Sequence, residues 1–160
     1  MLKKIVLIFI AFFPFQSFAQ LDTVEMSGGG KFDLTKVTTE DESYTVAIFD
    51  QVLVVNKSEH KLFNVKDIFV THECIGYAKS INKLTKLEGS CIFKDFNGDS
   101  WQGTFSREGN AGESGTGGTW NVKGLQGKYA DLRGTCSYVI KYIRNEELYG
   151  VDFVKCSFEK

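Results

Sequence analysis

Residues 136–156 read CSYVIKYIRNEELYGVDFVKC, and this stretch decides the fold. Residues 138–143 and 148–154 are rich in aromatic and β-branched side chains, with a polar run between them. Two such segments around a short polar turn are typical of a β-hairpin. A turn centred on Glu146 places Cys136 and Cys156 directly opposite one another. Directly opposed residues of antiparallel strands have Cα atoms roughly 4.5–5.5 Å apart, which is within the disulfide range. The stretch therefore predicts a hairpin closed by a Cys136–Cys156 disulfide.

The other two cysteines fit a second hairpin of the same kind. Cys74 and Cys91 lie at equal distances from a turn at residues 82–83, inside the polar stretch 79–86. Binding of a metal is the competing interpretation, but the cysteines form no CxxC motif and have no set of histidines nearby. An even number of cysteines in an exported chain favours disulfides. We therefore predict the pairs Cys74–Cys91 and Cys136–Cys156 and no metal site.

The rest of the chain also favours short strands separated by turns. Strand-like composition covers residues 44–55, 63–77, 90–96, 100–107 and 119–122, and Asn97-Gly98-Asp99 is a hairpin turn signature. Residues 27–31 (SGGGK) predict a flexible lead-in or turn, and the glycine-rich residues 109–119 predict a mobile loop. A helical period of 3.6 residues is convincing nowhere. Such a pattern indicates a sandwich or a closed barrel, and we predict an all-β fold with one antiparallel barrel of about eight strands.

The N-terminus predicts export. Lys3 and Lys4 precede the apolar run 5–13, and Ser17-Phe18-Ala19 places small residues where a signal peptidase cuts. A membrane anchor is the alternative, but a span needs about 20 apolar residues, and no later stretch is long enough either. We therefore predict a signal peptide at residues 1–19, a lead-in and first strand at 20–42, and a barrel domain at 43–160. The predicted location is the bacterial periplasm or the extracellular space.

The charge balance excludes some classes of partner. Removal of residues 1–19 leaves 17 basic residues against 20 acidic ones. Nucleic acids and anionic membranes select basic surfaces. We therefore expect neither of them as the main partner.

One segment carries a resemblance to a known family. Gly118-Thr119-Trp120, Gly124 and Gly127–Gly134 (GKYADLRG) resemble the G-T-W…G-x-G-K-Y-A-G-x-x-G signature of bacterial exported proteins with an allene-oxide-cyclase-like, or dirigent-like, barrel. Cys91 followed by Asp95–Asp99 (DFNGD) resembles the cysteine and acidic turn that precede this signature. The resemblance implies an eight-stranded barrel with a lumen and no settled activity. The catalytic residues of the plant cyclase have no counterpart in these motifs, so none is carried over.

The sequence names no catalytic residue and no cofactor. Asp95–Asp99 lacks the spacing of an EF-hand loop, and residues 109–118 lack a phosphate-binding motif. His72 and Glu73 are neighbours in a predicted strand, so their side chains point to opposite faces. No G-x-S-x-G elbow is present. These observations favour a protein that is not an enzyme.

Aromatic residues are the remaining candidates for a binding site. Side chains that alternate along a strand point alternately into and out of a barrel. We expect a set of aromatic side chains to face the lumen and to contact any bound ligand: Trp101, Phe105, Trp120, Tyr138 and Tyr142. A packed core without a cavity is the alternative. The leading hypothesis is a non-catalytic exported barrel that binds a small apolar ligand or a protein partner. Two alternatives stay open: an isomerase or cyclase acting on a lipid-derived substrate in the lumen, and a structural or secreted interaction protein that forms homo-oligomers through a face of the barrel.

Overall fold

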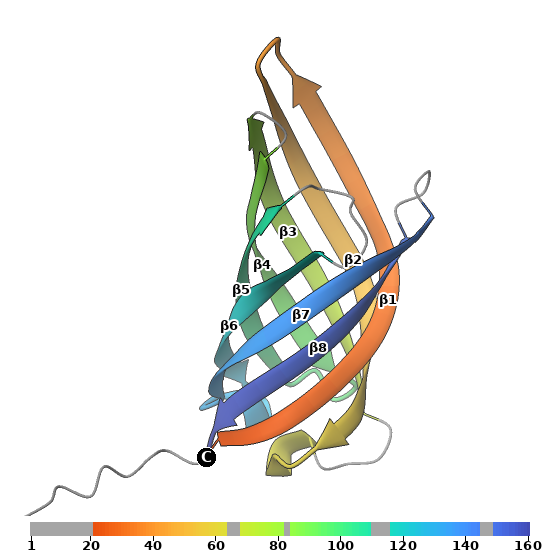
Figure 1. The fold of residues 1–160 in the computed structure, drawn as a ribbon. Coiled ribbons are helices and arrows are strands. Elements are labelled where there is room, and N and C mark those ends of the chain that lie inside the picture. Colours follow the sequence, from red (N-terminus) through yellow and green to blue (C-terminus); the bar gives the residue numbers. More distant parts are fainter. Residues whose placement is uncertain (1–20, 64–67, 82–83, 110–115, 145–148) are drawn as a thin grey trace, which may run out of the picture.

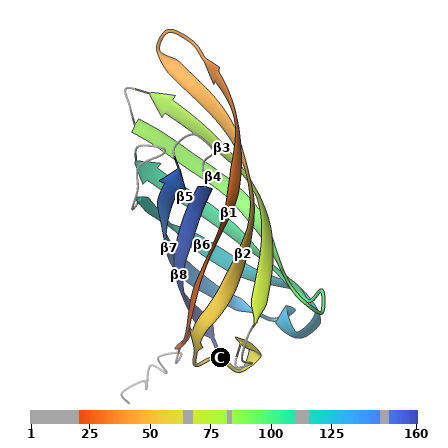
Figure 2. The same cartoon turned by 90° about the vertical axis from the view of Figure 1, so that its right-hand side faces the viewer.

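Eight antiparallel strands form a single closed barrel (Figures 1 and 2). The computed structural model describes residues 21–63, 68–81, 84–109, 116–144 and 149–160. Two short 3₁₀ helices, η1 and η2, accompany the strands. The elements, in chain order, are β1 (Leu21–Thr38), β2 (Glu42–Ser58), η1 (Lys61–Phe63), β3 (Phe69–Ile81), β4 (Leu84–Asp95), β5 (Ser100–Gly109), β6 (Thr116–Gln126), η2 (Gly127–Tyr129), β7 (Arg133–Arg144) and β8 (Tyr149–Glu159).

Each strand pairs with its neighbours in the sequence, and β1 pairs with β8 to close the sheet. Closure pairs every strand on both sides around the barrel. At the open end, residues 32–38 of β1 extend past the described part of β8 and pair only with β2. The predicted all-β barrel of about eight strands is confirmed, and the sandwich is excluded. Figure 1 shows β1 and β2 reaching farther than the other strands at the end opposite the C-terminus. We call that end the open end and the other the closed end.

Both predicted disulfides are present. Cys74 lies opposite Cys91 in the β3–β4 ladder, and Cys136 lies opposite Cys156 in the β7–β8 ladder. The Cα atoms of the two pairs are 4.0 Å and 3.9 Å apart. All four sulfur-bearing side chains are buried inside the barrel. Two disulfides are consistent with an oxidising compartment.

Three local predictions were wrong or only partly right. Residues 27–31 are not a lead-in or turn, because they lie within β1 and pair with both β2 and β8. The predicted strand 63–77 begins only at Phe69, because residues 61–63 form η1. In the glycine-rich stretch 109–119, β6 already begins at Thr116. Composition misplaced residues 27–31 because the glycines there are held in the sheet by β2 and by β8, which is far away in the sequence.

Other predictions fall partly outside the described residues. The signal peptide at 1–19 lies wholly outside them, as do residues 110–115 of the glycine-rich stretch. Within residues 20–42, the described strand β1 is a wall of the barrel rather than a separate lead-in.

Side chains alternate between the two faces of the sheet along most of each strand, as a barrel requires, with register shifts at Glu25/Met26, Ser100/Trp101 and Tyr142/Arg144. In β3, for example, Val70, His72, Cys74 and Ala78 are buried while Thr71 and Glu73 are exposed. The buried set from all eight strands forms one continuous apolar core. The same parity therefore identifies most residues that face the lumen.

Candidate functional site

The closed end of the lumen is filled by aromatic rings. Phe63 of η1 is buried there and stacks on Phe158, with ring centroids 5.2 Å apart. Trp101 stacks on Phe93 at 5.3 Å and meets Tyr129 edge-on at 4.5 Å. Such close-packed rings leave no room for a ligand, so this end of the barrel is a structural plug.

The open end contains the larger cavity, which we call the cup. Its volume is about 330 Å³, within the range of roughly 300–1,000 Å³ that small-molecule sites occupy. Apolar side chains and the buried Arg107 form its inner end, hydroxyl groups lie nearer the open end, and Arg107 and Lys36 supply positive charge. The lining residues are Phe32, Leu34, Lys36, Ser43, Thr45, Ala47, Phe49, Ala78, Ser80, Thr85, Leu87, Arg107 and Tyr142.

A much smaller cavity, which we call the polar pocket, lies between the cup and the plug. Its volume is about 20 Å³, and a cavity needs roughly 10–15 Å³ to hold one water molecule. Phe32, Phe49 and Leu87 line both cavities and so form the partition between them. The other residues that line the polar pocket are Gln51, His72, Cys74, Cys91, Phe105, Trp120, Tyr138, Ile140 and Asp152.

Three polar side chains on the polar pocket are buried and incompletely satisfied. Among the described residues, Nε2 of Gln51, Nε2 of His72 and Oδ1 of Asp152 have no hydrogen-bond partner. Most buried polar groups in proteins are hydrogen-bonded, because leaving one unpaired costs free energy. Three such atoms around one cavity therefore mark it as more than a packing defect.

Burial also changes the protonation of these groups. It raises the pKa of Asp152 from 3.8 to about 7, although the positive charge of Arg107 opposes the shift. Burial lowers the pKa of His72 from 6.5 to about 4 and raises the pKa of Tyr138. At neutral pH, His72 is therefore uncharged and the Asp152 carboxyl is close to its titration midpoint.

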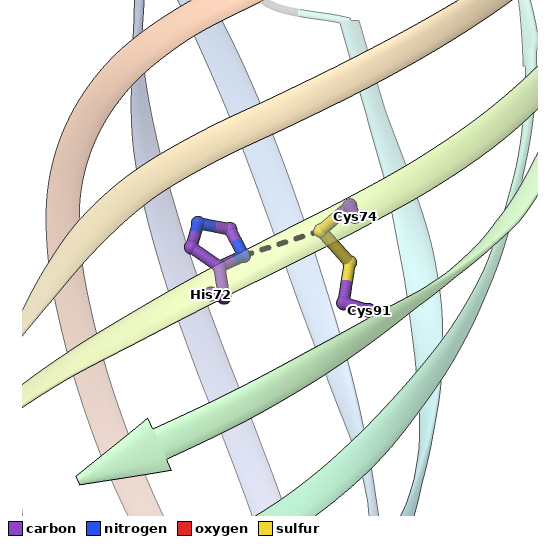
Figure 3. Close-up of side chains that lie close together, drawn as sticks. All are labelled: His72, Cys74 and Cys91. Atoms are coloured by element: carbon purple, nitrogen blue, oxygen red, sulfur yellow. Dashed lines mark hydrogen bonds between the residues drawn. A yellow bond between two sulfur atoms is a disulfide. The ribbon is translucent and has the colours of Figure 1, made fainter.

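His72 also touches one of the disulfides. Its Nδ1 lies 3.4 Å from Sγ of Cys74 (Figure 3). His72, Cys74 and Cys91 bring three potential metal-ligand atoms within 4.8 Å of one another. The two sulfur atoms are bonded to each other, however, and only a thiolate binds a metal strongly. In the oxidised protein this cluster therefore offers one imidazole nitrogen and no metal centre.

The aromatic residues expected at the lumen fall into three groups. Phe105, Trp120 and Tyr138 line the polar pocket. Tyr142 lines the cup, and Trp101 belongs to the plug at the closed end, where it meets neither cavity. The five residues therefore do not form a single site.

Sequence reasoning missed the polar residues of the lumen. Asp152 lies four residues before Cys156 and shares its parity, and Arg107 lies two residues after Phe105 on the same face. His72 was considered only as a partner of Glu73, which indeed points to the opposite face and is exposed. Residues two or four positions away along a strand point to the same face. The positions of the cysteines and of Phe105 could therefore have identified Asp152, Arg107 and His72 as residues of the lumen.

The chain matches no protein-family model and no curated protein. The allene-oxide-cyclase-like resemblance is therefore carried only by the residues quoted above. Within the described residues, no helix is long and apolar enough to cross a membrane.

Proposed function

We propose that this protein is an exported, non-catalytic β-barrel that binds a small, mainly apolar molecule in the cup. The cup is the observation that carries the proposal, because its volume of about 330 Å³ suits a small organic ligand. Phe32, Phe49 and Leu87 form the inner end of the cup, with the buried Arg107 opposite Leu87. Ser43, Ser80 and other hydroxyl side chains line the part nearer the open end. The closed sheet forms the cup in advance of binding, and a preformed site lowers the cost of binding.

Filling the cup tests this proposal. Ala47 faces the cup, and Ala47→Phe places a ring in it, whereas Val52 of the same strand faces outward and Val52→Phe is the matched control. The probe is 1-anilinonaphthalene-8-sulfonate, whose fluorescence rises in an apolar site. We expect the wild-type protein and V52F to bind it alike and A47F to bind at least about tenfold more weakly. Equal binding by all three proteins would overturn the proposal.

The enzymatic alternative has one feature in its favour. A buried carboxyl group with a raised pKa, such as that of Asp152, is typical of catalytic acids and bases. Asp152 lines the polar pocket, however, whose volume of about 20 Å³ is that of a single water molecule. An isomerase or cyclase would need the reacting carbon of its substrate beside this carboxyl. The volume therefore favours binding over turnover of a lipid-derived substrate.

A second candidate function rests on the outer surface. Val46 and Ile48 of β2 lie opposite Tyr77 and Ile75 of β3, and the four side chains are 43–60% exposed. A block of exposed apolar residues on adjacent strands is typical of a protein contact surface. We propose this block as the face through which the barrel would form homo-oligomers. Sedimentation equilibrium of the wild-type protein and of Ile48→Lys tests it: a wild-type dimer that I48K dissociates is expected, and a monomer at all concentrations contradicts it.

The two disulfides and the N-terminal sequence both support an exported location, in the periplasm or outside the cell. Oxidised cysteine pairs persist in secreted and periplasmic proteins, and residues 1–19 have the pattern of a signal peptide. N-terminal sequencing of the protein from the periplasm of an expressing bacterium should begin at Gln20. A chain that retains Met1 in the cytoplasm would contradict export.

A further inference from the structure

The polar pocket gives a reason to expect a particular chemical group at the buried end of the ligand. Gln51 and His72 lie opposite one another in the β2–β3 ladder. Asp152 comes from β8 and lies opposite Gly28 of β1, while Gln51 lies opposite Gly30 of the same strand. Between Gln51 and Asp152, β1 therefore contributes glycine and no side chain.

The glycines of β1 are what allow these polar side chains to share one space. A Cβ atom at Gly30 would lie 2.6 Å from Cγ of Gln51 and 2.2 Å from the carbonyl oxygen of Asp50. A Cβ atom at Gly28 would lie 1.8 Å from the carbonyl oxygen of Val52. The side chain of Gln51 therefore lies over the bare backbone of β1, and any larger residue there would displace it.

The contact between His72 and the disulfide is a hydrogen bond in only one tautomer of the imidazole. A disulfide sulfur carries no hydrogen, so the contact between Nδ1 and Cys74 Sγ is a hydrogen bond only if Nδ1 carries the proton. Nε2 is then an acceptor. The polar pocket thus presents a donor, Nε2 of Gln51, and two acceptors, Nε2 of His72 and Oδ1 of Asp152, all without partners among the described residues.

A hydroxyl group matches this set, because it both donates and accepts hydrogen bonds. Above the pKa of Asp152, a carboxylate head has no hydrogen to donate and would face a second carboxylate, so the probes below are compared at about pH 8.5. An ammonium head has no lone pair to accept from Gln51. A hydroxyl oxygen is also close to the size of the water molecule that the cavity of about 20 Å³ can hold.

We propose that the polar pocket is the head-group site of the cup and selects ligands that carry a hydroxyl group at the end of an apolar chain. This inference rests on the proposed function of the cup. The apolar chain occupies the cup, and the hydroxyl passes between Phe32 and Phe49, whose ring centroids are 4.6 Å apart. This passage requires the two rings to move apart from their edge-on contact. The hydroxyl then donates to Asp152 or His72 and accepts from Gln51.

A pair of isomeric probes tests the head group. 1-Octanol and 1-methoxyheptane have the same atoms, but only the alcohol can donate a hydrogen bond, and octanoate replaces the hydroxyl with a carboxylate. Binding of each to the full mature chain is measured by isothermal titration calorimetry. The ether and octanoate leave the acceptors of Asp152 and His72 without a hydrogen bond. We expect the alcohol to bind at least about tenfold more tightly than either of them, since leaving a buried polar group unpaired costs about that much in affinity.

Two variants and a control assign the selectivity to the pocket. Asp152→Leu removes an acceptor at similar volume and should lower the alcohol-to-ether ratio at least about threefold. Gln51→Leu removes the donor and should weaken alcohol and ether together, since both accept from it. Asp50→Leu changes an exposed carboxylate next to Gln51 and should leave every affinity unchanged.

The outcomes separate this inference from the proposed function. Equal binding of alcohol, ether and octanoate would keep the cup as a binding site and overturn the hydroxyl head group. An alcohol-to-ether ratio that is unchanged in D152L, or alcohol and ether affinities that are both unchanged in Q51L, would also overturn it. If none of the three probes binds and A47F leaves dye binding unchanged, the proposed function fails and the head-group site fails with it.

Discussion

Replacing Asp152 with asparagine is expected to change how the stability of the barrel depends on pH. The side chain is 2% exposed, and burial raises its pKa from 3.8 to about 7 against the opposing charge of Arg107. The folded protein therefore holds this proton more tightly than the unfolded chain does. The contribution of the protonated Asp152 carboxyl to the free energy of unfolding is fully present below about pH 4 and is lost as the pH rises through about 7. One pKa unit corresponds to about 1.4 kcal/mol, so the loss approaches about 4 kcal/mol.

The contribution of His72 to the free energy of unfolding changes with pH in the opposite direction. Burial lowers its pKa from 6.5 to about 4, so the unfolded chain binds the proton first. The stability that follows from a neutral His72 is present above pH 6.5 and is lost as the pH falls toward 4, at a cost of about 3 kcal/mol. Between pH 4 and 6.5 the two contributions offset one another. In the wild-type protein the two together therefore give a nearly flat profile in this window.

The D152N variant removes the contribution of the Asp152 carboxyl and leaves that of His72. Its free energy of unfolding should rise with pH between 4 and 6.5, and the difference between variant and wild type should grow by about 4 kcal/mol between pH 4 and 8. Equilibrium urea denaturation, followed by tryptophan fluorescence at constant ionic strength with the disulfides intact, measures both proteins. Asp50→Asn, at an exposed position of β2, is the control and should show no such change. A difference between D152N and wild type that stays constant within about 1 kcal/mol over this range would refute the reasoning.

Three further predictions concern stability. His72→Gln should give the reverse profile of D152N, with the free energy of unfolding falling as pH rises from 4 to 6.5 in the same urea titrations. Replacing Cys136 and Cys156 together with alanine should lower the free energy of unfolding by roughly 3 kcal/mol, because the bridge spans 20 residues, and a loss below about 1 kcal/mol would contradict this. Gly124→Ala would place a Cβ 1.8 Å from the carbonyl oxygen of Tyr129, so we expect a loss above about 2 kcal/mol or no soluble protein, and wild-type thermal stability would count against it.

The two disulfides show how far local sequence reasoning could go. Each pair is symmetric about a polar turn, and the ladders place Cys74 opposite Cys91 and Cys136 opposite Cys156 as that symmetry requires. Hairpin register depends on residues close together in the chain, so composition and spacing suffice to predict it. The inward-facing parity of β7 and β8 was available from the same cysteines.

The candidate site was less accessible to such reasoning. The aromatic residues Trp101 and Tyr142 share the inward-facing parity, yet one lies in the plug and the other in the cup. Their height along the barrel depends on where each strand is registered against its neighbours and on how η1 turns Phe63 into the closed end. Parity gives the face of a strand and no position along the barrel axis.

The sequence by itself determined the class of fold, the hairpins and the pairing of the cysteines, because all three follow from turns and alternation over about twenty residues. Only the tertiary structure decided that residues 27–31 belong to a strand and that Asp152 faces the same pocket as Gln51. Both depend on β1 closing the barrel against β8, a contact between the two ends of the described chain. A pairing across so many residues leaves no local pattern, since its stability comes from the closed sheet as a whole.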